Sequence, residues 1–229
     1  MSTEVRPRIS FSQFVRYWNA DTSTKRRSVV RNLLVDSIPP SYYRDFQSAI
    51  QQYVRNNQTN DSILVQTINS LRNSQPSEAD NSYEYKRVEN NIDILQSAMN
   101  MIPFSLPVDF SLCTKKNYPK LLLPDTNLDI SVSPDFVYRY TYRNRVCVGA
   151  IKLFYVKEDL NEICADLLAT LLREFLIQQY ATIGSVRVQQ CRVIDLNTGI
   201  DTPAPMANQR RIEQISEDCR AIYDTLQRL

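Results

Sequence analysis

Two oppositely charged residues, Asp135 and Lys152, lie in a stretch of the chain that is otherwise dominated by aromatic and β-branched residues. This composition predicts short β-strands across residues 128–156. Lys152 would lie inside the last strand, in a row with Val148 and Ala150, because alternate residues share one face. An ammonium group in an apolar row is costly unless it has a partner. Asp135 is the candidate partner.

Two turn signals, Ser133-Pro134 and Arg143-Asn144, divide this stretch into three predicted strands. Asp135 then opens the second strand and Lys152 lies inside the third. A structural ion pair between the two side chains is one interpretation of this arrangement, and a lysine whose ammonium group reaches the edge of the sheet is another.

The chain contains no histidine, and this excludes several kinds of chemistry. Catalytic triads, histidine zinc sites and imidazole acid–base catalysis all need that side chain. The five cysteines are scattered singly without a C-x-x-C pair, so a zinc site is not expected. A metal would have to bind through oxygen, which favours Mg²⁺, Mn²⁺ or Ca²⁺.

Composition sets further bounds on location and partners. The odd, unpatterned cysteine count predicts reduced thiols, mostly packed as small hydrophobic groups, in a cytoplasmic protein. No apolar run is long enough to span a bilayer or to serve as a signal peptide, so no membrane partner is expected. Only 3 glycines are present, too few for a glycine-rich phosphate loop, so no nucleotide cofactor is expected. The net charge of +2 makes no general case for nucleic acid.

Hydrophobic periodicity predicts an α/β protein with most of its helices in the first half of the chain. We expect a helical region over residues 1–82, with a mobile start at 1–9, and an α/β domain over residues 83–229 with a four-stranded mixed sheet flanked by helices. The predicted helices cover residues 10–20, 22–35, 41–57, 60–71, 83–101, 159–180 and 208–229, and the outer strands cover 121–123 and 186–196.

The N-terminal helices offer two interpretations. Lys25, Arg26, Arg27 and Arg31 could form a basic patch that contacts phosphates, or they could form an ordinary solvated helix face. The tyrosines of residues 41–57 could stack on bases, but at helical spacing they are also typical of a core or of an interface with a protein partner.

The order of one helix, three strands, a helix, a strand and a helix, with Pro134-Asp135 opening one strand and Ile151-Lys152 in the next, resembles the restriction-endonuclease-like fold of the PD-(D/E)-x-K nuclease superfamily. The resemblance covers roughly residues 83–205 and extends to uncharacterised prokaryotic proteins with a nuclease-like core. It implies a site where carboxylates hold Mg²⁺ beside a lysine that stabilises charge. A role in prokaryotic defence or mobile-element biology is also implied by this resemblance alone.

Carried over residue by residue, Asp135 matches the first acid, Lys152 matches the lysine, and Ile151 matches the residue whose backbone carbonyl helps to ligate the metal. The second acid should stand at position 150, which is alanine. Glu174 on the following helix, or Glu89 on the preceding one, could substitute, since some members of the superfamily use a helix-borne acid. The alternative for both is an ordinary glutamate at the rim of a helix.

Three functions follow as hypotheses. The favoured one is a nucleic-acid-associated protein, with DNA or RNA as partner, whose nuclease-like site is inactive or nearly so because the second acid is missing. The second is an active Mg²⁺-dependent nuclease that recruits Glu174 or Glu89. The third is a protein–protein interaction module that binds its partner through the N-terminal helices.

Overall fold

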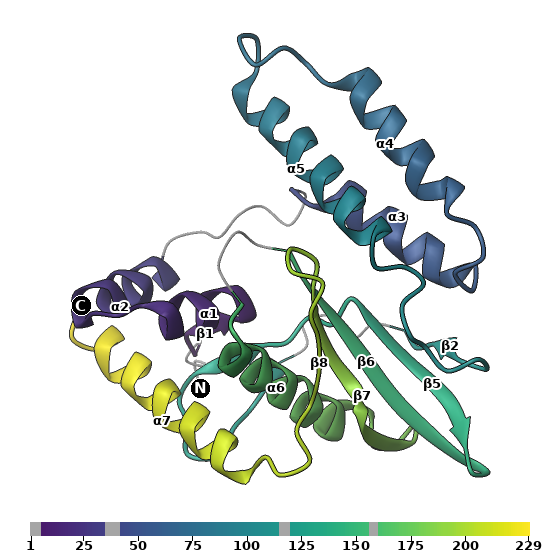
Figure 1. The fold of residues 1–229 in the computed structure, drawn as a ribbon. Helices are drawn as coiled ribbons and strands as arrows, with labels where there is room; N and C mark the ends of the chain where they lie inside the picture. Colours follow the sequence, from purple (N-terminus) through teal and green to yellow (C-terminus); the bar gives the residue numbers. More distant parts are fainter. Residues whose placement is uncertain (1–5, 35–41, 115–119, 156–159) are drawn as a thin grey trace, which may run out of the picture. The chain divides into compact units, whose positions relative to one another are not determined.

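The computed structural model describes residues 6–34, 42–114, 120–155 and 160–229 (Figure 1). The chain divides into two compact units, and each is built from separated segments. The first unit comprises Met1–Ser37, Asp109–Ile194 and Asp201–Leu229, and the second comprises Ile38–Val108 and Asp195–Ile200. The fold is therefore mixed α/β, as predicted. The predicted boundary between residues 82 and 83 falls at the start of a helix inside the second unit, and a division there stays a prediction.

A five-stranded mixed sheet lies in the first unit, with the strand order β2-β5-β6-β7-β8. In chain order its strands are β2 (Ser111–Leu112), β5 (Phe136–Tyr142), β6 (Arg145–Phe154), β7 (Ser185–Asp195) and β8 (Asp201–Pro203). β5 and β6 form an antiparallel hairpin, and helix α6 (Glu162–Tyr180) connects β6 to β7. The predicted hairpin, connecting helix and following strand are confirmed.

A second, three-stranded sheet corrects the predicted meander. β4 (Asp129–Ser131) was expected to be the first of three successive strands in one sheet. It pairs instead with β1 (Arg8–Ser10) in parallel and with β3 (Lys120–Leu121) in antiparallel orientation. The single four-stranded sheet of the prediction is thus replaced by sheets of five and three strands. Pro134 lies between β4 and β5, where a residue without a backbone N–H interrupts strand pairing.

β1 also corrects the expectation that residues 1–9 are a mobile start. Ile9 is fully buried, and its neighbour Ser10 caps helix α1 (Phe11–Asn19). The Ser10 hydroxyl accepts a bond from the Gln13 N–H, while the Gln13 side chain accepts one from the Ser10 N–H at 2.8 Å. This reciprocal arrangement fixes the start of the helix. Residues 1–5 lie outside the described part of the chain.

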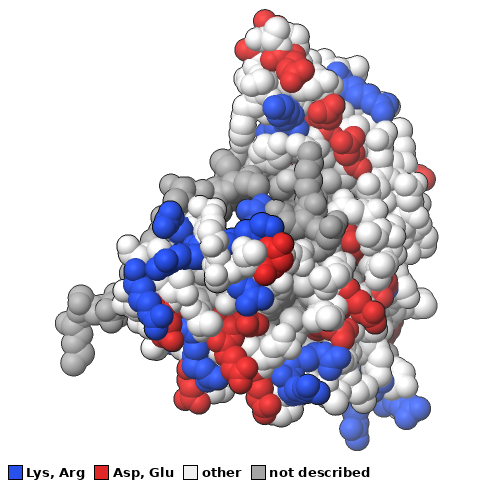
Figure 2. Space-filling model, turned by 60° about the vertical axis from the view of Figure 1, so that its left-hand side comes forward, with Lys and Arg blue, Asp and Glu red and all other residues white. Residues whose placement is uncertain are grey.

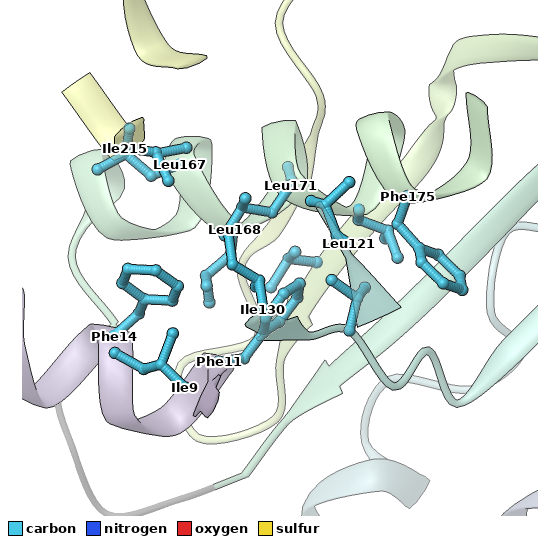
Figure 3. Close-up of a cluster of buried hydrophobic side chains, with 14 of the residues drawn as sticks. Ile9, Phe11, Phe14, Leu121, Ile130, Leu167, Leu168, Leu171, Phe175 and Ile215 are labelled. Carbon is cyan, nitrogen blue, oxygen red and sulfur yellow. The ribbon is translucent and has the colours of Figure 1, made fainter. Parts of the chain in front are cut away.

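Helix α6 lies at the centre of the hydrophobic core of the first unit. It packs against β3, β6 and β8, and against helices α1 and α7 (Gln209–Leu226). Figure 3 shows part of this core, where apolar side chains of α6 meet those of β1, α1, β3, β4 and α7; the labelled residues are Ile9, Phe11, Phe14, Leu121, Ile130, Leu167, Leu168, Leu171, Phe175 and Ile215. We expect the apolar side chains of the predicted helix 159–180 to face the core, and they do so except at Ile163 in the first turn, which is exposed. Asn161 caps the helix, through a 2.9 Å bond from the Cys164 N–H. Asp159, which the sequence offers as a cap because it begins the predicted helix 159–180, lies outside the described residues.

The second unit is a bundle of three helices, α3 (Arg44–Arg55), α4 (Ser62–Ser74) and α5 (Ser82–Met99), each of which contacts the other two. Its polar centre is Asn91, which is fully buried on α5. The Asn91 amide donates to the backbone carbonyl of Tyr42 at 2.7 Å and accepts from the Phe46 N–H at 3.0 Å. Tyr43 at the start of α3 makes no side-chain cap. Asn91, which lies on α5, therefore supplies a hydrogen-bond acceptor for a backbone N–H in the first turn of α3.

We expect Asn91→Ala to lower the free energy of unfolding by about 2 kcal/mol, because it removes an acceptor of the buried Phe46 N–H and a donor to the partly buried Tyr42 carbonyl. Asn90→Ala is the matched control. Asn90 is partly buried and bonds the Tyr42 hydroxyl rather than the backbone of α3. Urea unfolding measures both variants. Equal losses in the two would show that Asn91 does not act as a cap.

The remaining helix of the first unit is α2 (Ser23–Arg31), which a single 3-10 turn extends over Asn32–Leu34. All five cysteines are free thiols, and four of them are buried, in agreement with the prediction that most pack as small hydrophobic groups. Among the described residues, no helix combines the length and the apolar character that crossing a bilayer requires.

Candidate functional site

The pair Asp135 and Lys152 lies near the end of β6, where β5 begins. The register of the hairpin pairs Phe136 with Ile151 and Val137 with Ala150. One step further along the same register, Asp135 stands opposite Lys152, so both side chains project to the same face of the sheet. This is the face of Val137 and Ala150, which belong to the hydrophobic core around α6.

The two side chains form a direct ion pair. Lys152 Nζ donates to Asp135 Oδ2 at 2.9 Å, and the backbone N–H of Leu153 donates to the same oxygen at 2.8 Å. The lysine side chain is 16% exposed and the aspartate side chain 8%. The prediction that Asp135 supplies the partner of Lys152 is confirmed. Because both groups are largely withdrawn from water, each depends on the other for compensation of its charge.

Ile151 contributes its backbone to the same arrangement. Its carbonyl accepts a hydrogen bond from the Asp135 N–H at 2.9 Å. The Asp135 side chain accepts a hydrogen bond from the Leu153 N–H. At the end of the hairpin, this side-chain bond therefore stands where a backbone bond between the strands would otherwise form. The carbonyl that the nuclease pattern assigns to a metal is thus engaged in holding Asp135 in position.

Tyr155 is a neighbour of Lys152 that the sequence did not reveal. Its ring centroid lies 5.7 Å from Lys152 Nζ, within the range of a cation–π contact. Strand alternation would have placed Tyr155 on the opposite face, but β6 ends at Phe154 and the alternation ends with it. No pattern in the sequence marks this contact.

The charge state of Lys152 limits what it can do. Burial lowers the pKa of Lys152, but Asp135 and Tyr155 together raise it by more, so the pKa lies above its ordinary value of 10.5. Lys152 is therefore a cation at neutral pH and cannot act as a general base there. Since the pKa is raised on folding, the stabilisation is fully present below pH 10.5 and is lost only as the pH rises through the higher folded value.

The acids proposed as substitutes have surroundings of their own. The Glu174 carboxylate accepts a 2.6 Å bond from the Asn208 side chain, just before α7, rather than from Lys152. Glu89 is exposed on α5, in the second unit. Ala150, at the position of the missing second acid, is fully buried. Within the described ranges, no group of three or more His, Cys, Asp and Glu side chains is placed to hold a metal ion.

These residues do not suit Mg²⁺, which needs carboxylate oxygens and strongly bound waters in octahedral geometry. Asp135 offers one carboxylate, and one of its oxygens is already occupied by an ammonium group and a backbone N–H. A cation placed beside it would also meet the positive charge of Lys152 at close range. The arrangement is that of a self-compensated ion pair.

The basic residues of α2 are exposed, but two of them make local contacts. Lys25 pairs with Asp21 at 2.8 Å, and the Arg26 Nε donates to the Ala20 carbonyl at 3.1 Å while its guanidinium lies over the Tyr17 ring. Figure 2 shows positive and negative side chains interleaved over the face that it presents. A phosphate-binding role for α2 stays a prediction.

Comparison of the chain with protein-family models finds no match, and comparison with curated protein sequences finds none either. The class that the fold defines is a mixed α/β protein with an aspartate–lysine pair at the end of a central hairpin.

Proposed function

We propose that this protein is a nucleic-acid-associated protein with a PD-(D/E)-x-K nuclease-like core that does not cleave phosphodiester bonds. The observation that carries the second part is the occupancy of Asp135 Oδ2 by Lys152 and by the Leu153 N–H, with alanine at position 150. A hydrolytic centre of this type needs a carboxylate pair that is open to a metal. Here Lys152 neutralises the charge of Asp135, and alanine stands where the second carboxylate would be.

The nuclease-like part of the proposal draws support from the placement of the pair. A hairpin, a connecting helix and a further strand follow one another, and the aspartate and lysine project to one face at the start of one hairpin strand and near the end of the other. β4 departs from the superfamily order because it lies in the other sheet. The support therefore comes from β5, β6, α6 and β7.

We expect no cleavage of supercoiled plasmid, single-stranded DNA or single-stranded RNA when each is incubated with the protein in Mg²⁺ or Mn²⁺. The physical reason is the alanine at position 150, where the second acid of the nuclease pattern should stand. Gel electrophoresis of the products, with Asp135→Asn and Glu174→Gln as parallel samples, makes the measurement.

Two outcomes would decide against an inactive site. Cutting that disappears in Asp135→Asn would identify Asp135 as a metal ligand. Cutting that disappears in Glu174→Gln as well would identify the helix-borne acid of the alternative hypothesis. Cutting that persists in both variants would point to a contaminating nuclease, and a repurified sample would settle the matter.

A further inference from the structure

The far end of the β5–β6 hairpin carries a cluster of arginines around one tyrosine, and we call it the hairpin-end cluster: Tyr142, Arg143, Arg145 and Arg187. Arg143 and Asn144 form the turn (Figure 1). Both have positive φ, at 50° and 59°, which is the backbone of a two-residue type I′ turn. Tyr142 and Arg145 are directly paired across this turn, so their side chains project to the same face.

Two guanidinium groups lie against the ring of Tyr142. The Arg187 Cζ is 4.2 Å from the ring centroid and the Arg143 Cζ is 5.3 Å from it, both within cation–π range. Arg187 comes from β7, so the cluster joins residues that are 44 positions apart in sequence, from 143 to 187. Tyr142 remains 38% exposed, and Arg143 and Arg145 are exposed. The cations are thus held in place while their outer edges face solvent.

The arginines of the cluster differ from other arginines of the first unit in their salt bridges. Elsewhere in the first unit, Arg192 pairs with Asp201 and Arg211 with Asp166. In the part of the chain that the structure describes, none of the three cluster arginines makes a salt bridge. Asp109 contacts this end of the hairpin, and its carboxylate accepts a bond from the Thr141 N–H at 3.0 Å. The three arginines of the cluster outnumber this carboxylate.

Turn geometry gives no reason for an arginine at position 143. A type I′ turn favours Asn-Gly, because both central residues adopt the left-handed conformation. A long side chain with a β-carbon is strained there. Arg143 and Asn144 therefore have strained backbones, and the turn places the Arg143 guanidinium beside Tyr142. Strain of this kind, together with unpaired cations, indicates a site rather than a simple connection.

We propose that the hairpin-end cluster binds single-stranded nucleic acid. Guanidinium groups contact the phosphates, and the exposed surface of Tyr142 and of the guanidinium groups beside it receives a base. An acidic peptide would satisfy the charges but would make no use of the stacked planar groups. This inference rests on the proposed association with nucleic acid, and it names the surface and the strandedness of the ligand.

The test measures the binding of a fluorescently labelled 20-nucleotide single strand by anisotropy, at several salt concentrations, with a duplex of the same sequence beside it. The first variant is the double substitution Arg143→Asn with Asn144→Gly, which removes the cation and gives the turn its preferred residues. The second is Arg187→Gln. Arg27→Gln on α2 is the matched control, because it removes one exposed positive charge at a distance in sequence.

We expect both cluster variants to weaken single-strand binding roughly tenfold, and the slope of log K against log salt to become shallower by roughly 0.7 for each arginine removed. The control changes binding less than twofold. The Asn-Gly variant also melts at a higher temperature than the wild type, so its loss of binding does not come from unfolding.

The contrary outcomes are distinct. If the wild type binds but the cluster variants bind equally well, this inference is wrong and the proposed function stands. If only Arg27→Gln weakens binding, the surface is α2 instead. If poly-glutamate displaces the strand as well as unlabelled single strand does, the cluster is a site for acidic peptides. If the wild type binds no nucleic acid at low salt, the proposed function itself fails.

Discussion

Asp135→Ala is expected to lower the free energy of unfolding by about 3 kcal/mol, because it leaves the Lys152 ammonium group in a largely buried position without its counter-charge. It also leaves the Leu153 N–H without its acceptor. The 8% exposure of the aspartate side chain means that water replaces these bonds only in part. Urea unfolding followed by circular dichroism measures the change.

The matched variants separate charge from hydrogen bonding. Asp135→Asn keeps an acceptor for both donors and removes only the charge, so it should cost less than Asp135→Ala. Replacing both members, Asp135→Leu with Lys152→Met, should recover much of the loss, since a well-packed apolar pair often equals a buried ion pair. A loss below about 1 kcal/mol in Asp135→Ala would mean that Lys152 reaches solvent without help, as in the snorkelling alternative.

Gly149→Ala is the second large effect, and it acts through packing alone. A β-carbon at Gly149 would lie 2.7 Å from the Gln190 Cβ and 2.7 Å from the Tyr138 ring and hydroxyl. Tyr138 is fully buried, and its hydroxyl donates to the Gln190 side chain at 2.6 Å, so neither neighbour is free to swing away. We expect a loss of about 3 kcal/mol in the free energy of unfolding.

Gly199→Ala provides the comparison for Gly149. Gly199 has a positive φ of 76°, and nothing lies within 4 Å of a β-carbon placed there. Its substitution carries backbone strain without a clash and should cost about 1 kcal/mol. If the two variants lose equal stability, the crossing of Tyr138 over Gly149 is not a tight contact in solution. Both are measured in the same urea series.

The helices were predictable because their signals are local. The apolar stripe of α6 and the Ser10 cap of α1 each depend on residues within a few positions of one another. The Arg143-Asn144 turn was predictable for the same reason. The pairing of Lys152 with Asp135 followed from strand alternation and the cost of an unpaired charge in an apolar row.

The partners of β4 were not predictable in the same way. Asp129–Ser131 reads as a strand, but nothing within the strand says that it pairs with residues 8–10 rather than with the next strand. The contacts of Tyr142 with Arg187 and of Asn91 with the start of α3 are likewise long-range. Such contacts are decided by the packing of the whole unit, and a single sequence carries no local trace of them.

The parallel pairing of β1 with β4 has a consequence for how the chain acquires its structure. Helices α3, α4 and α5 lie between these two strands in sequence, so the contacts among the three helices can form before β4 has been synthesised. Local helical contacts form quickly, whereas a strand pair that closes more than a hundred residues must wait and bears a large loop-closure cost. We therefore expect the three helices to fold early, while the chain is still being synthesised. Ile9 stays exposed to water and to chaperones until β4 has formed and the sheet can bury it.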